Sequence, residues 1–516
     1  MRVPLNIWDY LERAAFVHGD RVAVVDEPTA PAALGRLTYA QLHGRARGLA
    51  AALDRMGVED GARVAIVSPN SARFLVAFFG VSGFNRILVP INFRLTAHEI
   101  GYIVAHSGAS VLLVDPDLAP AVAGVAVRHR IVMDGGGQDA ALFAEATPGV
   151  EPRRREIDEN ETASINYTSG TTARPKGVQL THRGLWLNAA IFGWHTGVSD
   201  RDVYLHTLPM FHCNGWGMAY AVTGMAGRHV VLRKVDGEEI LTRVEREGVR
   251  LLCGAPAVVA MTLDAAEKRR AAGLPVPGRG TVRMVVAGAP PPSKVIARMQ
   301  AELGWEFIQI YGLTETSPLL TINRAPAEWE GLDGEETARR LSRAGGPALG
   351  VAVRVDDEGE VCVRSNHVFE GYWEQPDETA KAIVDGWFHT GDGGRMDGPY
   401  LVISDRKKDV IITGGENVSS IEVEDCLFQH PAVAEAAVIG VPDDRWGETI
   451  KALVVLKPGA AVSERDLIDF CRTRMAHFKC PTSVEIRAEL ARTATGKLQK
   501  FRLREPYWTG RERRVN

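Results

Sequence analysis

The sequence reads Tyr-Thr-Ser-Gly-Thr-Thr-Ala-Arg-Pro-Lys-Gly from Tyr167 to Gly177. Hydroxyls, glycines and one lysine in a short loop suit a polyphosphate, because backbone N–H groups can point into one concavity and the lysine offsets phosphate charge. Lys176 follows a proline and precedes a glycine, so the order is not that of a P-loop. The loop therefore predicts ATP binding, with a solvated loop that binds nothing as the alternative.

Length and composition are those of a soluble protein with more than one domain. A chain of 516 residues is too long for one ordinary core, so at least two domains are expected. Hydrophobic residues make up 45% and charged residues 24%, as in globular proteins. The net charge of −4 gives no electrostatic reason to expect nucleic acid as a partner.

The sequence predicts neither a transmembrane segment nor a secretion signal. Its longest apolar run, Phe74 to Phe84, contains glycine and serine and has about half the length that a bilayer requires. Charged residues interrupt any apolar signal core near the N-terminus. Six cysteines without a CxxC pair predict reduced thiols rather than a disulfide framework or a zinc site. We expect a cytoplasmic protein, and association with a membrane surface stays open.

Apolar periodicity predicts an α/β fold in which strands and helices alternate. The pairs Thr38/Gln41 and Thr96/Glu99 have the spacing of capping boxes at helix N-termini. Loops that follow strand C-terminal ends, such as the one after Tyr311, are where open α/β sheets bind ligands. The expected strands include 64–67, 87–89, 111–114, 251–252, 282–286 and 307–311.

After Ser404 the pattern changes to a smaller α+β unit. Strands are expected near 410–412, 433–441 and 450–456, and helices near 421–428 and 467–475. We therefore predict a large multi-sheet N-terminal domain, residues 1–404, and a small mobile lid domain, residues 410–516. The charged run 405–409 joins them, although such a run taken alone is more often a solvated linker.

The loop at 167–177 resembles the signature of the adenylate-forming superfamily, which includes acyl-CoA synthetases, firefly-type luciferases and adenylation domains of peptide synthetases. Further motifs match in the family's order along the whole chain. They are Leu-Pro-Met-Phe-His (208–212), Tyr-Gly-Leu-Thr-Glu-Thr (311–316), His-Thr-Gly-Asp (389–392), Ser-Asp-Arg-Lys-Lys-Asp (404–409), Gly-Gly-Glu-Asn (414–417) and Arg-Thr-Ala-Thr-Gly-Lys (492–497). The set as a whole most resembles AMP-forming fatty-acyl-CoA synthetases.

The resemblance implies that a carboxylic acid attacks ATP to give acyl-AMP and pyrophosphate, and that the acyl group then passes to CoA. ATP, Mg²⁺ and CoA are the implied cofactor and co-substrates. Because charge builds on the phosphates, the first step needs a metal, a cation and oriented donors. The implied ATP-binding residues are Thr168, Ser169, Gly170, Thr171, Thr172, Lys176, Gly288, Ala289, Pro290, Tyr311, Gly312, Asp392 and Arg406.

The same resemblance implies individual roles within the nucleotide site. Glu315 would bind Mg²⁺, with Thr168 as a further metal ligand, and Thr316 would donate to the α-phosphate. Tyr311 would stack on adenine. Asp392 would accept both ribose hydroxyls, since a carboxylate has no donor of its own.

The lid would carry residues that act in turn. Lys497 would bridge the substrate carboxylate and the α-phosphate during adenylation. Lys408 would be the hinge at which the lid rotates between an adenylating and a thioester-forming pose. Gly414 and Gly415 would line the channel for the pantetheine arm.

A third catalytic residue, His212, would lie beside the acyl carboxylate, and Trp216 would gate the acyl pocket. Simple core packing is the alternative interpretation of both side chains. The region offers no obvious fixed charge, which favours an apolar acid, either fatty or aryl. The predicted pocket residues are Phe211, Trp216, Ala255 and Val258.

Three departures from the family pattern, at Ala173, Gly393-Gly394 and Ala491, bear on rate and specificity more than on reaction type. The main alternative function is an adenylating enzyme that passes its acyl group to a carrier protein or another nucleophile. A sensor of ATP without turnover is disfavoured, because the implied catalytic groups are present. The sequence leaves a homodimer open and does not specify the acid or the acceptor.

Overall fold

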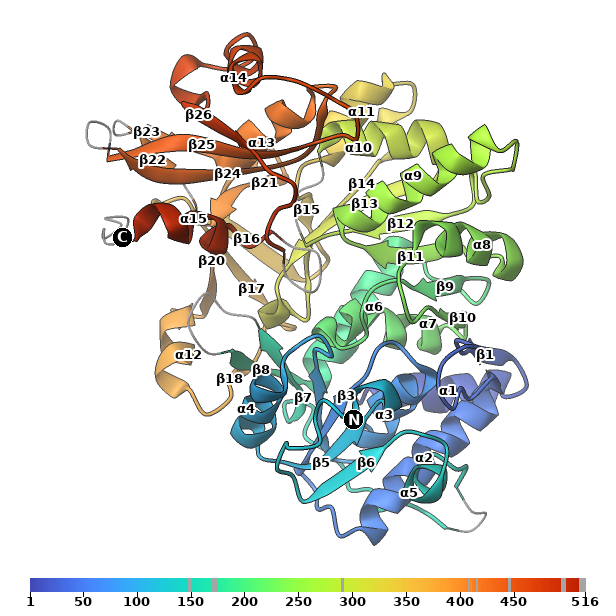
Figure 1. Cartoon of the computed structure of the whole chain (residues 1–516). Coiled ribbons are helices and arrows are strands. Elements are labelled where there is room, and N and C mark those ends of the chain that lie inside the picture. The colour runs from blue at the N-terminus through green and yellow to red at the C-terminus, as the bar shows by residue number, and fades with distance from the viewer. Residues whose placement is uncertain are drawn as a thin grey trace.

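The computed structural model describes residues 1–146, 150–168, 175–288, 292–406, 409, 411–413, 416–443, 447–492 and 498–509. These residues form a mixed α/β structure built on several sheets, as the sequence predicts (Figure 1). Within the described ranges, no helix has both the length and the apolar character needed to cross a bilayer. The apolar run that begins at Phe74 is instead part of the buried helix α3.

The first large sheet carries the ends of the phosphate loop. In the described part of the chain its strand order is β18-β8-β7-β4-β3-β5-β6. Strands β7 and β8 are antiparallel, and β7 pairs with β4 in parallel. The strand bounds are β3 Arg63–Val67, β4 Ile87–Ile91, β5 Ala109–Val114, β6 His129–Val132, β7 Thr162–Thr168, β8 Lys176–Thr181 and β18 Gly371–Tyr372.

The second large sheet has the order β15-β14-β13-β12-β11-β9-β10-β1-β2 among the described residues. Its central strands from β12 to β10 are parallel, so their C-terminal ends lie at one edge. The bounds are β1 Val22–Val25, β2 Arg36–Thr38, β9 Val203–His206, β10 Arg228–Val231, β11 Leu251–Gly254, β12 Arg283–Val286, β13 Glu306–Gly312, β14 Leu319–Arg324 and β15 Gly346–Pro347.

Helices cover both sheets, and α2, α3, α6 and α7 contribute to one large hydrophobic core with strands of both. Both predicted capping boxes are confirmed: Thr38 caps α2 and Thr96 caps α4. The helix bounds are α1 Trp8–His18, α2 Tyr39–Arg55, α3 Ala72–Ser82, α4 Ala97–Ser107, α5 Gly137–Leu142, α6 His182–Thr196, α7 Met218–Gly224, α8 Gly237–Glu247, α9 Pro256–Ala271, α10 Ser293–Arg298, α11 Gly334–Leu341 and α12 Pro376–Ala382.

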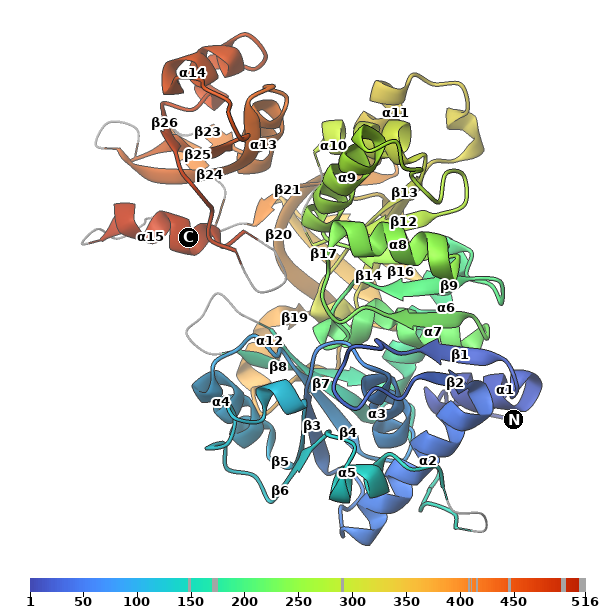
Figure 2. The same ribbon diagram turned by 45° about the vertical axis from the view of Figure 1, so that its right-hand side comes forward.

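A smaller antiparallel sheet follows in the chain and leads toward the lid (Figure 2). Its order is β16-β17-β20-β19, and β21 pairs with β20. The sequence analysis did not anticipate this sheet. Its strands are β16 Val351–Val355, β17 Glu360–Ser365, β19 Ile383–Val384, β20 Trp387–Asp397 and β21 Tyr400–Arg406.

The C-terminal unit is an α+β sheet with helices, as predicted, and it has its own hydrophobic core. Helix α14 ends at Arg472, three residues before the predicted end at Met475. The domain boundaries at 404 and 410 stay a prediction. The elements are β22 Ile411–Thr413, β23 Glu416–Val418, α13 Ser420–Phe428, β24 Val433–Asp443, β25 Gly447–Leu456, α14 Glu464–Arg472, β26 Ser483–Ile486 and α15 Lys500–Trp508.

Candidate active site

The two ends of the phosphate loop are adjacent, because Thr168 at the end of β7 pairs with Lys176 at the start of β8. Lys176 Nζ lies 2.5 Å from Glu378 Oε2 on α12 and 4.7 Å from the centre of the Tyr372 ring. The hydrogen bond from Lys176, followed by one from Lys381, holds the pKa of Glu378 down at about 2. The predicted phosphate-binding cation is thus already paired with a carboxylate from α12. Helix α12 lies beside β18 and β8 in Figure 1.

Glu315 lies in a one-turn helix, Thr314–Thr316, directly after β13. Its Oε1 accepts a hydrogen bond from the Tyr372 hydroxyl at 3.0 Å. Burial raises the pKa of Tyr372, and the Glu315 carboxylate raises it further. Tyr372 therefore contacts both Lys176 and Glu315, which places the predicted cation and metal ligand at one site. A carboxylate oxygen is a ligand type that Mg²⁺ prefers, so Glu315 fits the implied metal.

The hydroxyl of Thr316 is used within its own turn. It accepts from the Leu313 N–H at 3.0 Å and lies 2.6 Å from the Pro318 carbonyl oxygen, to which it can donate. Thr316 is fully buried, whereas Thr314 in the same turn is partly exposed. The predicted α-phosphate contact from Thr316 is therefore not favoured in this conformation, and Thr314 is the better candidate.

Tyr311 and Asp392 come from two different sheets and meet at the site. The Tyr311 hydroxyl donates to Asp392 Oδ2 at 2.8 Å. Next to Tyr311, a Cβ on Gly312 would lie 1.6 Å from the Pro318 carbonyl oxygen, so this position admits glycine alone. Arg406 pairs with Asp392 through the backbone of β21 and β20. The residues predicted to contact adenine and ribose are thus neighbours.

The segment after His212 contains an unusual run of left-handed backbone, from Cys213 to Gly217, which we call the left-handed turn. Its φ angles are 40°, 45°, 60°, 59° and 83° in order. Residues with side chains adopt this conformation at a cost, so neighbours must compensate. Buried Asn214 donates to Ser164 Oγ at 3.1 Å, and Asn188 donates to the Trp216 carbonyl at 3.2 Å. Buried amide side chains therefore hold the backbone beside the predicted acyl site.

The predicted acyl residues fall into two groups. Phe211 and Trp216 belong to the large core, and the Phe211 ring contacts Phe93 edge-on with 5.8 Å between centroids. Val258 of α9 packs into a different hydrophobic cluster from Phe211 and Trp216. Ala255 is partly exposed at the N-terminus of α9 and stays a candidate for the pocket.

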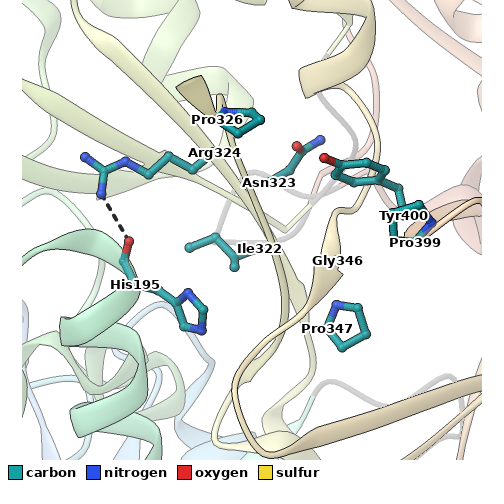
Figure 3. Close-up of a pocket in the computed structure, with 9 residues that line it drawn as sticks. All are labelled: His195, Ile322, Asn323, Arg324, Pro326, Gly346, Pro347, Pro399 and Tyr400. Atoms are coloured by element: carbon teal, nitrogen blue, oxygen red, sulfur yellow. Dashed lines mark hydrogen bonds between the residues drawn. The ribbon is translucent and has the colours of Figure 1, made fainter. Parts of the chain in front are cut away.

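Two cavities lie outside the predicted site residues. One of about 700 Å³ lies between α4, residues 124–126 and Pro175, next to the base of the phosphate loop. Another of about 430 Å³ lies at strands β14 and β15, where the Arg324 guanidinium donates to the His195 carbonyl at 3.2 Å (Figure 3). Figure 3 labels its lining residues as His195, Ile322, Asn323, Arg324, Pro326, Gly346, Pro347, Pro399 and Tyr400.

Several predicted residues lie outside the described part of the chain. Gly288, which precedes two of these residues, follows β12 and has a φ of +92°. Arg492 and Leu498, on either side of the predicted catalytic lysine in the sequence, form a backbone bridge. The backbone of Arg406 is described but its side chain is not. The predicted residues outside the described ranges are Ser169, Gly170, Thr171, Thr172, Ala289, Pro290, Lys408, Gly414, Gly415 and Lys497.

The sequence analysis missed Tyr372 and Glu378, the side chains that contact Lys176. No local signal marks them, because they follow Lys176 by 196 and 202 positions and reach it through the pairing of β18 with β8. It also missed Asn188 and Asn214. Both are buried, and a polar side chain gives no local sequence signal of burial. An acidic residue opposite a phosphate-loop lysine could have been found only with the sheet order in hand.

Comparison with family models gives matches over most of the chain. A model described as AMP-binding enzyme matches residues 11–373. A second, described as AMP-binding enzyme C-terminal domain, matches residues 422–497.

Individual proteins are similar over nearly their whole lengths. The 2-methylpropanoate–CoA ligase of Humulus lupulus is 37% identical, with 97% of this chain and 95% of the relative covered. The structure of an anthranilate CoA ligase in complex with anthranoyl-AMP has a TM-score of 0.87, 27% identity and 98% coverage of both chains. The structure of an amide bond synthetase from Marinactinospora thermotolerans has a TM-score of 0.83 and 27% identity, covering 97% of this chain and 99% of that one.

Proposed function

Because the chain belongs to the family of AMP-binding enzymes, we propose that it is an AMP-forming acyl-CoA ligase for a small apolar carboxylic acid. Acyl-CoA ligases of this family use ATP, Mg²⁺ and CoA. The observation that carries the proposal is the meeting of Lys176, Tyr372 and Glu315 at one site, because adenylation needs a cation and a metal ligand near the same phosphates.

Lys176 would exchange its partner when ATP binds. Glu378 pairs with Lys176 in this structure, and phosphate oxygens offer the same kind of acceptor with more charge. Glu315 would hold Mg²⁺, which supplies charge stabilisation at the phosphates when bound. The Tyr372 hydroxyl already donates to the same carboxylate and would keep it oriented.

Thr314 would take the role that the sequence suggested for Thr316. Its side chain is partly exposed in the turn that carries Glu315, and its carbonyl lies 3.8 Å from Cys213 Sγ of the left-handed turn. This contact joins the turn that carries Glu315, the predicted metal ligand, to the predicted acyl site. A carboxylate placed near His212 would therefore lie close to the donors that act on the α-phosphate.

An apolar and small acyl group is supported by the side chains around His212. Phe211 and Trp216 are 7% and 5% exposed and pack with other apolar residues. Two large rings would limit the depth of a pocket at this place. The related ligases named above act on 2-methylpropanoate and anthranilate, which are both small acids.

Trp216 offers a direct test of the acyl site. Its φ of 59° suits glycine, so Trp216→Gly removes the ring without adding backbone strain. We expect the preferred acid to become longer by several carbons while the dependence on ATP stays unchanged. The matched control is Trp194→Gly, because Trp194 is 78% exposed on α6. An unchanged acid preference in Trp216→Gly would remove this residue from the pocket.

The decisive experiment is pyrophosphate release measured over a panel of carboxylic acids, with and without CoA. We expect release to depend on a small apolar acid, and AMP and an acyl-CoA thioester to form when CoA is present. ADP as the product would overturn the proposal. Adenylation that turns over with an amine or a carrier protein but not with CoA would support the alternative acceptor instead.

A further inference from the structure

A mixed cluster of sulfur, nitrogen and oxygen ligands lies in the small sheet, apart from the residues assigned above. Cys362 on β17 and His389 on β20 are directly opposite each other on paired strands. Asp356 lies in the turn between β16 and β17. One ligand atom from each of the three side chains lies within 4.8 Å of those of the others. These are the residue types that bind zinc in proteins.

The two separations that involve Cys362 match those of a tetrahedral metal centre. Cys362 Sγ lies 3.5 Å from His389 Nδ1 and 3.8 Å from Asp356 Oδ2. With Zn–S of about 2.3 Å and Zn–N or Zn–O of about 2.1 Å, tetrahedral angles place such ligand pairs about 3.6 Å apart. The cluster could therefore close around an ion without a large movement.

The backbone orients these ligands before any ion binds. Asp356 Oδ1 accepts the N–H groups of Glu358 and Glu360 at 3.0 and 2.8 Å, while Oδ2 faces Cys362. Cys362 is fully buried, and the His389 side chain is 26% exposed, which leaves a way in for an ion. A site that is fixed by strand pairing loses little conformational freedom on binding.

The neighbouring charges also suit a cation. Glu360 Oε2 lies 3.4 Å from His389 Nδ1, and its Oε1 accepts the Gly391 N–H at 2.8 Å. Arg354 is opposite Cys362 in the next strand, but its guanidinium lies over the Trp387 ring at 4.5 Å. Two carboxylates and a thiol thus face the imidazole from one side of the sheet.

We propose that Asp356, Cys362 and His389 form a binding site for a thiophilic divalent cation of the zinc type, with water as the fourth ligand. Glu360 connects this site to the Gly391 backbone, next to Asp392. Binding therefore stabilises the small sheet and the strand that carries the predicted ribose ligand. Cysteine spacing does not reveal this site, because its ligands come from a turn and two strands.

The test is titration of the chelator-treated full chain with Zn²⁺ and, in parallel, with Co²⁺. We expect one equivalent of Zn²⁺ to bind and to raise the thermal midpoint of unfolding. Co²⁺ should give the thiolate-to-cobalt charge-transfer absorption that reports a Co–S bond. Cys362→Ser should weaken Zn²⁺ binding at least about 100-fold, since losing an outer partner alone costs about 10- to 100-fold.

Two further variants keep the outcome interpretable. Asp356→Asn keeps an oxygen for the two N–H groups and should fold normally while weakening Zn²⁺ binding. Cys426→Ser removes a thiol in the lid, where Cys471 and Cys480 also lie, and should leave binding unchanged. Zn²⁺ binding that survives both Cys362→Ser and Asp356→Asn, or a cobalt spectrum without a thiolate band, would overturn the proposal.

Discussion

The Tyr311 hydroxyl donates to Asp392 Oδ2 at 2.8 Å, across the boundary between the nine-stranded sheet and the small sheet. Asp392 is 7% exposed, so this hydrogen bond lies in a largely buried setting. The contact orients the carboxylate that is expected to receive the ribose hydroxyls. The same hydrogen bond couples the position of Tyr311, the predicted adenine contact, to that of Asp392, the predicted ribose contact.

Tyr311→Phe should therefore raise KM for ATP while kcat changes less, because the lost hydrogen bond acts on nucleotide binding. Hydrogen bonds to charged groups contribute about 1.5–3 kcal/mol, which corresponds to roughly 10- to 100-fold. Steady-state kinetics at saturating acid measure the effect. Tyr10→Phe is the control, since it removes a hydroxyl bonded to the Trp186 carbonyl at 2.6 Å, away from the site. An equal rise in both variants would contradict the assigned role.

Glu378→Gln should lower the Kd for ATP by several-fold, because it removes the carboxylate that competes with phosphate for Lys176. Asp377→Asn on the same helix changes charge equally without touching Lys176 and serves as control. Isothermal titration with ATP compares the two variants. Weaker ATP binding in Glu378→Gln than in Asp377→Asn would show that Glu378 assists Lys176 rather than competing with it.

Lys497→Ala should depress adenylation about 100- to 1000-fold, because a cation beside developing negative charge acts in the first transition state. Thioester formation from preformed acyl-adenylate should be largely kept. Single-turnover assays of each half-reaction measure both rates. Equal loss in the two assays by a folded variant would argue that the lysine does not act in adenylation alone.

Lys408→Pro should trap one pose of the lid, since proline fixes φ near −65° and removes an N–H. Nucleotide binding should survive, because most predicted ATP residues precede position 404. Next to the predicted hinge, Asp409 accepts a charge-assisted hydrogen bond from Arg504 of α15 at 3.0 Å. The measured quantity is the ratio of the two half-reaction rates, and an unchanged ratio would place the hinge elsewhere.

Acid should destabilise the fold through buried histidines. Burial lowers the pKa of His182 and His367 to about 4 and of His229 to about 3, from an ordinary value of 6.5. These groups stay neutral in the folded chain, whereas the unfolded chain binds protons below pH 6.5. The free energy of unfolding should thus fall as pH drops from 6.5 toward 4, by up to about 1.4 kcal/mol per unit and histidine.

Thermal unfolding midpoints between pH 7.5 and 5 check this dependence. His367→Gln should show a shallower fall, since it removes one of the titrating groups. His98→Gln is the control, because His98 is exposed on α4. Parallel pH curves for wild type and His367→Gln would contradict the assignment.

Local patterns allowed much of the fold to be predicted. The capping boxes at Thr38 and Thr96 and the apolar strands of both large sheets depend on residues close in sequence, so periodicity reveals them. The small sheet was missed because its strands lack a long apolar run. Strand β16 alternates between partly exposed and exposed positions, and the buried part of β17 begins with the charged residue Glu360.

The site was predictable where one motif supplies both residue and context, as for Lys176 and Glu315. The site was not predictable where burial determines which residue can reach a ligand. Sequence spacing alone cannot tell whether Thr314 or Thr316 is the buried threonine. Val258 was grouped with Trp216 on apolarity, although the two side chains pack in different clusters. Partners such as Tyr372 depend on strand pairing across distant parts of the chain.

The left-handed turn at 213–217 restricts how the acid preference of this protein can change in evolution. Residues other than glycine, asparagine and aspartate adopt left-handed backbone conformation at a cost in folding free energy. Most replacements within the turn would therefore be selected against because they lower stability. Changes in substrate range would therefore occur at positions outside the left-handed turn, such as Ala255, or by substitution of Trp216 with glycine. With Trp216 in the pocket as proposed, a lineage that acquired that glycine would gain pocket volume in a single step, whereas a return to a large side chain would again need the support of the amides of Asn188 and Asn214.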